Sequence, residues 1–232
     1  MQLEKGDVIF ADMGSENTTD HTQKGWRPVL VLEFFPKSMT CTAIPITSQN
    51  KKRNLPTHIC VTKEDIPVLN GDNTILCENC TTINLGNPDG YRKLSYNVCQ
   101  QNPRIWRKII RGLSVQLSQR FDACGSSIDT SFRRGSIVHI KDVDSPVIVV
   151  SNDKNNTYST NLTVAPLPQS MSQNPGIRSR IETSPMLEFG IHTDKVKIIN
   201  IPKNDVLDGV GFEKRIANQI SKRYIDLCLL NS

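Results

Sequence analysis

Short segments of residues suited to strands, some alternating and some a proline followed by four aliphatic residues, form a series that occurs twice along the chain. In the first half these segments are KGDVIFAD (5–12), RPVLVLE (27–33), TCTAIPITS (40–48), THICVT (57–62) and TILCENCTTIN (74–84). The second half repeats them in the same order as RGSIVHIKD (134–142), SPVIVVS (145–151), NLTVAPLPQ (161–169), SRIETS (179–184) and GIHTDKVKIIN (190–200). Period-two alternation predicts strands, and proline is tolerated where a strand begins. The pattern therefore predicts an internal duplication.

Each half closes with a segment of helical periodicity. In the first half, Asn102 and Pro103 form a suitable helix cap and first turn. The apolar stripe that follows consists of Ile105, Trp106, Ile109, Ile110, Leu113, Leu117 and Phe121. The stripe of the second half consists of Phe212, Ile216, Ile220, Tyr224 and Cys228. Such stripes predict amphipathic helices that turn their apolar side to a core. The basic residues that fall away from much of the first stripe are expected to form a solvated face; they are Arg104, Arg107, Lys108 and Arg111.

The segment between the halves, ACGSSIDTS (123–131), has the small and polar composition of a linker. Two runs of strands, each followed by one helix and without βαβ alternation, indicate a mostly β protein with helices. We predict two tandem β-barrels, each with a C-terminal helix, over residues 1–122 and 132–232.

The overall composition is that of an ordinary globular protein. Of the 232 residues, 37% are hydrophobic and 22% are charged, and the net charge of +5 permits a polyanionic ligand without requiring one. No apolar run approaches the roughly 18 residues of a membrane-spanning helix. The opening segment MQLEKGDVIF also lacks the basic and apolar regions of a signal peptide. We expect no membrane association and a cytoplasmic location.

The seven cysteines are scattered and odd in number, which favours reduced thiols. Cys77 and Cys80 form a C-x-x-C pair inside the predicted strand 74–84. Residues three apart on a strand point to opposite faces, so these two thiols are not expected to converge on a metal.

Two motifs of the first half carry a family resemblance. The segments GSENTTDHTQKGWRPVLVL (14–32) and AIPITS (43–48) resemble the MazF/PemK toxin endoribonucleases, in which a Gly-Ser-Glu loop runs into Gly-x-Arg-Pro and Pro-x-Thr-Ser follows one strand later. The resemblance covers residues 4–118 well and residues 132–230 weakly.

The resemblance implies metal-independent cleavage of single-stranded RNA without a cofactor, by attack of a ribose 2′-OH on the neighbouring phosphate. It places Arg27 at the phosphate, a role that suits a permanently charged guanidinium fork, and Thr47 beside it as a hydrogen-bonding group. His21 is a candidate general acid or base, with Glu16 in the same loop. The candidate RNA-binding residues around the motifs are Trp26, Lys24, Ser48, Lys51, Lys52 and Arg53.

Each of these residues also has a plain structural interpretation. Arg27 could cover a barrel end, His21 and the Lys51–Arg53 run could be solvated loop residues, and Trp26 could pack in the core. The order and spacing of the two motifs favour the functional interpretation of Arg27 and Thr47.

The second half departs from the motifs where chemistry is expected. Ser145 stands at the position of the arginine and Pro168 at that of the threonine. Pro28 follows Gly6 by 22 positions, whereas Pro146 follows Gly135 by 11, so the loop is also shortened. We predict that residues 132–232 do not cleave RNA.

Family members commonly form homodimers that bind RNA across the interface and are held by an antitoxin. The resemblance therefore suggests a pseudo-dimer within one chain, with a further homodimer and a cognate antitoxin as possible partners. The alternative to a nuclease is a non-catalytic module that binds RNA or a protein partner. A gyrase-targeting poison with the same fold is a third hypothesis, against which the Arg-Pro and Pro-x-Thr-Ser motifs argue.

Overall fold

The computed structural model describes residues 3–13, 25–36, 38–49, 55–86, 90–117, 132–141, 146–158, 161–167 and 199–229. The chain divides into two compact units, one formed by Met1–Gln116 with Cys228–Ser232 and the other by Leu117–Leu227. The predicted linker 123–131 lies outside the described residues, so the predicted domain boundaries stay a prediction. None of the described helices is both long and apolar enough to cross a membrane.

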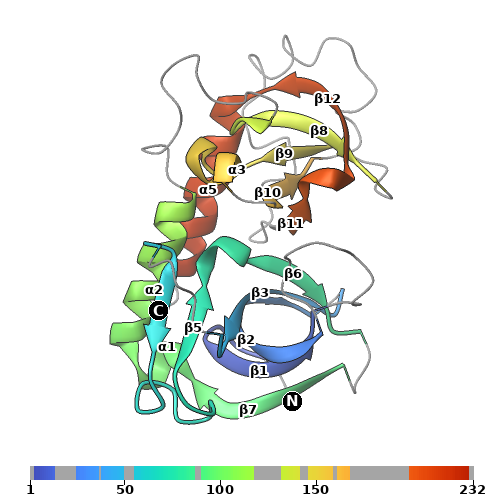
Figure 1. The fold of residues 1–232 in the computed structure, drawn as a ribbon. Coiled ribbons are helices and arrows are strands. Elements are labelled where there is room, and N and C mark those ends of the chain that lie inside the picture. The colour runs from blue at the N-terminus through green and yellow to red at the C-terminus, as the bar shows by residue number, and fades with distance from the viewer. Residues whose placement is uncertain are drawn as a thin grey trace. The chain divides into compact units, whose positions relative to one another are not determined.

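The first unit is an antiparallel sheet of seven strands, and two helices follow its last strand in the sequence (Figure 1). Its elements are β1 (Asp7–Asp12), β2 (Trp26–Phe35), β3 (Thr40–Thr47), β4 (His58–Val61), β5 (Asn73–Leu76), a 3-10 turn (Cys77–Asn79), β6 (Thr81–Asn84), β7 (Tyr91–Asn97), α1 (Val98–Gln101) and α2 (Pro103–Gln116). The strand order is β4-β5-β3-β2-β1-β7, and β6 also pairs with β3.

Strand alternation supplies the core of the first unit. One apolar cluster gathers alternate residues of β1, β2 and β3, whose side chains share a face because the side-chain period of a strand is two. Its buried members are Leu3, Ile9, Ala11, Val29, Val31, Cys41, Ala43, Ile83 and Leu85.

Helix α2 begins and packs as the sequence predicts. The Asn102 side chain accepts a hydrogen bond from the Ile105 amide at 3.2 Å, which confirms the cap. The predicted apolar stripe is buried over Ile105–Leu117, while Phe121 lies outside the described residues. The helix approaches the 3-10 turn closely at Gly112, where an added Cβ would lie 2.8 Å from the sulfur of Cys77.

A short junction ties β1 to the start of α1. Gly6 has a positive φ of 86°, and its carbonyl accepts from the amide of Val98 at 2.7 Å. The Asn97 side chain donates to the carbonyl of Lys5 at 2.8 Å and accepts from the amide of Gln100 at 3.0 Å. The contacts of Gly6 with Val98 and of Lys5 with Asn97 join residues 92 positions apart.

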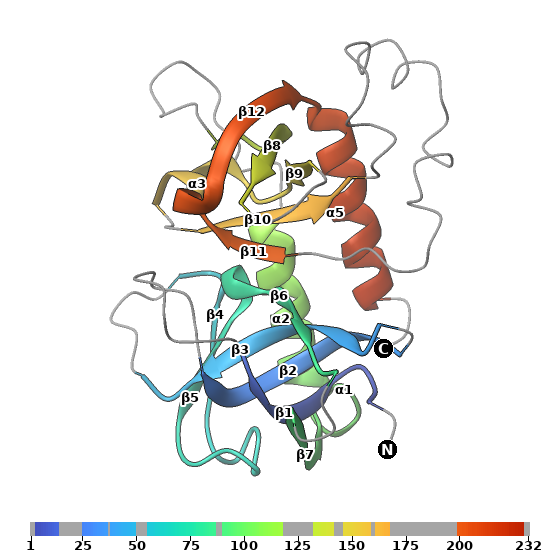
Figure 2. The ribbon, with the colours of Figure 1, turned by 90° about the vertical axis from the view of Figure 1, so that its right-hand side faces the viewer.

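The second unit contains a five-stranded antiparallel sheet and a long final helix. Its elements are β8 (Ser136–Ile140), β9 (Val147–Val149), α3 (Asp153–Tyr158), β10 (Asn161–Pro166), β11 (Ile199–Pro202), a 3-10 turn (Lys203–Asp205), β12 (Val206–Phe212) and α5 (Lys214–Leu229). The strand order is β11-β10-β9-β8-β12. In Figure 2, β12 leads directly into α5.

Arg134 is the most deeply enclosed charged residue of the described second unit, with 1% of its surface exposed. Its guanidinium donates to the Ser221 hydroxyl at 2.6 Å, to the Asn218 side chain at 2.7 Å and to the carbonyl of Val150. Hydrogen bonds on several sides are what a buried cation requires. Arg134 thereby fastens the start of β8 to the inner side of α5.

The two units share one arrangement of strands. The order β6-β3-β2-β1-β7 followed by α2 in the first corresponds to β11-β10-β9-β8-β12 followed by α5 in the second. Equivalent backbone hydrogen bonds also recur, from Gly6 to Val31 at 2.9 Å and from Gly135 to Val149 at 2.8 Å. This correspondence supports the duplication, which stays a prediction.

The predicted fold class, mostly β with helices, is confirmed. The segment 74–84 is not one strand, because Cys77–Asn79 form a 3-10 turn between β5 and β6. The argument that Cys77 and Cys80 point to opposite faces of a strand is therefore wrong, and both thiols are buried. Within the described ranges, no group of three or more His, Cys, Asp or Glu side chains is placed to hold a metal.

Two further strands were not predicted, β7 and β12. Phe212, assigned to the final helical stripe, is the last residue of β12 and is 51% exposed. Its four-residue spacing from Ile216 continues the helical period by coincidence across the strand–helix boundary. Ile216, Ile220 and Tyr224 are buried as predicted. The predicted strand 179–184 and most of 190–200 lie outside the described residues.

Candidate functional site

The first unit contains a cleft of about 430 Å³ at one end of its sheet. Apolar and aromatic side chains supply part of its lining, from Phe10, Trp26, Pro28, Ile46, Val68, Leu69 and Leu94. The polar lining comes from Arg27, Thr47, Ser48, Gln49, Asn70, Asn73 and Arg92. Among the described lining residues, the charged ones are both arginines. A cleft with this lining attracts an anion.

Strand register brings Arg27 and Thr47 to this cleft. Strands β2 and β3 pair with Val29 opposite Pro45 and Leu30 opposite Ile44. If this register continues for two more residues, Arg27 lies opposite Thr47. Because side chains alternate along a strand, the two side chains then lie on the same face of the sheet. The two residues that the sequence motifs single out therefore end neighbouring strands at the same place.

Arg27 lies in a partly desolvated environment. It is half-buried, and this burial lowers the pKa of its guanidinium from the ordinary value. An arginine remains protonated near neutrality because its ordinary pKa lies above 12. Removing water around the cation strengthens its attraction to an anion in the cleft.

Thr47 is held in one orientation at the end of β3. Only 7% of its surface is exposed, and its hydroxyl oxygen accepts a hydrogen bond from the amide of Gln49 at 3.1 Å. A hydroxyl has one donor and two acceptor sites, so this contact leaves the O–H able to donate. Thr47 can therefore offer a hydrogen bond to an oxygen bound in the cleft.

Trp26 stands at the mouth of the cleft rather than in the core. Its ring is 51% exposed and stacks on Phe10, with the ring centroids 5.9 Å apart and the planes inclined by 28°. The core-packing interpretation of Trp26 is therefore wrong, and its ring is available to a ligand. Ser48, also exposed, follows Thr47 along the cleft.

The other predicted site residues lie outside the described residues. They are His21, Glu16, Lys24, Lys51, Lys52 and Arg53, together with Ser145 and Pro168 of the second half. Their proposed roles rest on sequence.

The cleft also contains residues that sequence reasoning missed. They are Phe10 of β1, Asn70 of the segment before β5, Asn73 of β5 and Arg92 of β7. Asn73 is buried and donates from its side chain to the carbonyl of Gly71 at 2.8 Å. The alternating segment YRKLSYN, which forms β7, was the one available signal for Arg92.

Part of the first unit is similar to known proteins. Residues 4–93 match the family model described as PemK-like, MazF-like toxin of type II toxin-antitoxin system. The Mycobacterium tuberculosis toxin MazF-mt6 is 24% identical, with 47% of this chain and 96% of that chain covered and a TM-score of 0.33. A second solved structure, of an Mtb toxin, is 29% identical, with 39% of this chain and 93% of that chain covered and a TM-score of 0.27.

No curated protein is similar enough to match the chain. The family match lies wholly within the first unit and includes both the Gly-x-Arg-Pro and the Pro-x-Thr-Ser motifs. Residues 4–93 are therefore similar to the PemK-like, MazF-like toxin of type II toxin-antitoxin systems.

Proposed function

We propose that the chain is a toxin-type endoribonuclease that cleaves single-stranded RNA without a metal. The observation that carries the proposal is the alignment of Arg27 and Thr47 in one cleft, where the charged residues among the described lining are both arginines. The family match to residues 4–93 supports the same reaction class.

In the proposed reaction a ribose 2′-oxygen attacks the adjacent phosphorus and the 5′-oxygen of the next nucleotide leaves. The products are a 2′,3′-cyclic phosphate and a 5′-hydroxyl, so one proton must leave the 2′-OH and one must reach the 5′-oxygen. The phosphorane between them carries added negative charge. Arg27 stabilises that charge, because a fixed cation in a partly desolvated cleft acts most strongly where charge develops.

The Thr47 hydroxyl donates a hydrogen bond to a phosphate oxygen and so holds the phosphate beside Arg27. His21 is proposed as the residue that exchanges a proton with the substrate, with Glu16 supporting the loop. Trp26 stacks on a base, and Ser48, Lys24, Lys51, Lys52 and Arg53 contact the RNA backbone. A single-stranded substrate fits this assignment because its bases are free to stack on an exposed aromatic ring.

Incubation of the full chain with a long single-stranded RNA in EDTA tests the proposal. We expect cleavage by the unaltered chain and a loss on the order of 10²-fold or more for Arg27→Ala, because a preorganised stabilising group is removed. Thr47→Ala should lose cleavage as well.

Arg107→Ala is the matched control, because Arg107 is an exposed arginine on α2 outside the cleft. It should cleave like the unaltered chain. Undiminished cleavage by Arg27→Ala would contradict the site assignment. No cleavage of varied RNAs by the unaltered chain would favour the binding-module alternative.

The proposal extends to partners. An antitoxin protein is the partner that the family description implies, and the cytoplasm is the location where the RNA substrate would be met. The second unit is proposed to act as the inert half of a pseudo-dimer that contributes RNA-binding surface without cleaving.

A further inference from the structure

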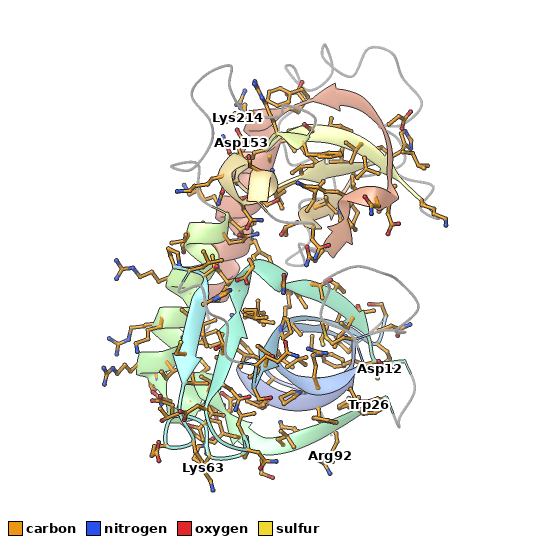
Figure 3. The ribbon with its side chains drawn as sticks, in the orientation of Figure 1. Asp12, Trp26, Lys63, Arg92, Asp153 and Lys214 are labelled. Carbon is orange, nitrogen blue, oxygen red and sulfur yellow. The ribbon has the colours of Figure 1, made fainter. Side chains whose placement is uncertain are left out.

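A row of side chains crosses three strands at the edge of the cleft. Phe10 of β1 is paired in register with Arg92 of β7 on one side and with Pro28 of β2 on the other. The guanidinium carbon of Arg92 lies 5.8 Å from the centroid of the Phe10 ring, and Trp26 stacks on the same ring. Phe10 is thus flanked by an arginine from one neighbouring strand and a tryptophan from the other. Figure 3 shows Arg92 and Trp26 at this end of the first unit.

Exposure differs along this row in a way that suits ligand binding. Phe10 is half-buried, whereas Arg92 and Trp26 are exposed. A guanidinium that lies over an aromatic ring is held by a cation–π contact, and its N–H groups remain directed outward in its own plane. The contact with Phe10 therefore favours an orientation of Arg92 in which its hydrogen-bond donors face outward, and within the described ranges it is an exposed residue of the cleft lining.

We propose that Arg92, held on the Phe10 ring, binds an RNA phosphate that flanks the one bound at Arg27. The inference rests on the proposed function, since it assigns a second position along the same RNA strand. The register sets Arg27 opposite Ala11 and Arg92 opposite Phe10, so the two side chains leave the sheet on opposite faces, and both line the cleft. One RNA strand in the cleft would therefore contact Arg27 with one phosphate and Arg92 with a neighbouring one.

The placement of Arg92 defines the kinetic effect of losing it. A phosphate one step from the reacting phosphorus carries the same charge before and during the reaction, so Arg92 binds substrate and transition state equally. Removal of such a contact raises KM and leaves kcat unchanged. Arg92 is accordingly a substrate-binding residue and not a catalytic one.

Binding without cleavage provides the first test. A fluorescein-labelled single-stranded RNA oligonucleotide is titrated with the full chain carrying Thr47→Ala, in EDTA, at salt concentrations from about 50 to 200 mM. Each phosphate contact to a single strand contributes about 0.7 to the slope of log K against log salt. Adding Arg92→Gln should lower the slope by about 0.7 and weaken binding about tenfold at low salt. Adding Arg107→Gln, which removes the same charge outside the cleft, should change neither.

Kinetics in the chain with Thr47 intact provide the second test. Arg92→Gln should raise KM about tenfold without changing kcat. Arg92→Lys keeps the charge without the planar fork, so it should retain the salt slope and recover part of the affinity.

The outcomes separate this inference from the proposed function. An unchanged salt slope in Arg92→Gln overturns the inference, and an acidic protein segment would then be the better occupant for Arg92. An unchanged KM alongside active cleavage also overturns it while leaving the nuclease proposal intact. A lowered slope in a chain that never cleaves RNA would support the phosphate contact and count against the nuclease.

Discussion

Burial sets the chemistry of individual residues in the first unit, and Cys41 is a clear case. Its thiol lies fully buried among Val29, Val31 and Ala43. Desolvation raises the pKa of Cys41 to about 12, against an ordinary value of 9.0. The folded chain therefore keeps this thiol neutral in a range of pH where an unfolded chain would ionise it.

This difference predicts a specific dependence of stability on pH. Above about pH 9 the unfolded thiol loses its proton while the folded one retains it, so the free energy of unfolding falls as pH rises toward 12. The contribution of Cys41 is at most about 1.4 kcal/mol per pH unit. This contribution is measured by denaturant unfolding at pH 7 and near pH 10, for the unaltered chain and for Cys41→Ala. The variant should lose less stability between these pH values.

Cys60 supplies the control for this experiment, because it is an exposed cysteine of the same unit. Cys60→Ala should show the same loss of stability on raising the pH as the unaltered chain. Equal pH dependence in all three proteins would contradict the assignment to Cys41.

In each unit, at the level of elements, a glycine before the first strand contacts the start of a later helix. Gly135 has a positive φ of 95°, and a Cβ added there would lie 2.7 Å from the backbone nitrogen and Cα of Lys214. Its carbonyl accepts from the amide of Glu213 at 2.7 Å. Gly6 makes the equivalent junction with α1 in the first unit.

We predict that Gly135→Ala destabilises the second unit by about 2–4 kcal/mol, because left-handed strain adds to a clash with backbone atoms that cannot move independently. Gly209→Ala in β12 is the control, since an added Cβ meets nothing within 4 Å there. Hydrogen exchange of the β8 and β9 amides measures the effect. Equal protection in the two variants would show that the junction is not tightly constrained.

Elements with short apolar runs were predictable from the sequence, and elements set by long-range contacts were not. The strands from KGDVIFAD and RPVLVLE were predicted because each contains a run of four apolar residues, preceded by glycine and aspartate in the first and by proline in the second. The 3-10 turn at Cys77–Asn79, which the sequence analysis missed, lies against α2 at Gly112, 35 residues later in the chain. Local periodicity carries no information on such a contact.

The same distinction applies to the site. Arg27, Thr47 and Trp26 stand in short motifs on consecutive strands, so their convergence followed from order and spacing. Arg92 reaches the cleft only through the pairing of β7 with β1, more than eighty residues earlier in the chain. A single sequence does not reveal that register, which the fold as a whole determines.

At the scale of the whole molecule, the two units share a strand order, but the family match and the motif residues Arg27 and Thr47 lie in the first unit. The predicted duplication sets Ser145 at the position of the arginine in the second half. We therefore expect the Arg27→Ala chain to have no residual cleavage from residues 132–232.

The pseudo-dimer proposal predicts that the second unit strengthens RNA binding. A chain ending at residue 122 should bind the labelled oligonucleotide at least about tenfold more weakly than the full chain, both carrying Thr47→Ala, because two linked surfaces gain from their effective concentration. Circular dichroism of the shortened chain checks that its sheet has formed. Undiminished affinity in a folded shortened chain would refute the pseudo-dimer.

The pairing of β1 with β7 also sets an order of events during synthesis. Phe10 emerges from the ribosome early, but its partner Arg92 follows 82 residues later. At a translation rate of roughly 5–20 residues per second, that interval is on the order of ten seconds. Until then β1 lacks its outer neighbour, and the cleft lacks Arg92. A nascent first unit thus carries Arg27 and Thr47 long before the cleft is complete, so a ligand that needs the whole cleft can be bound only late in the synthesis of the domain.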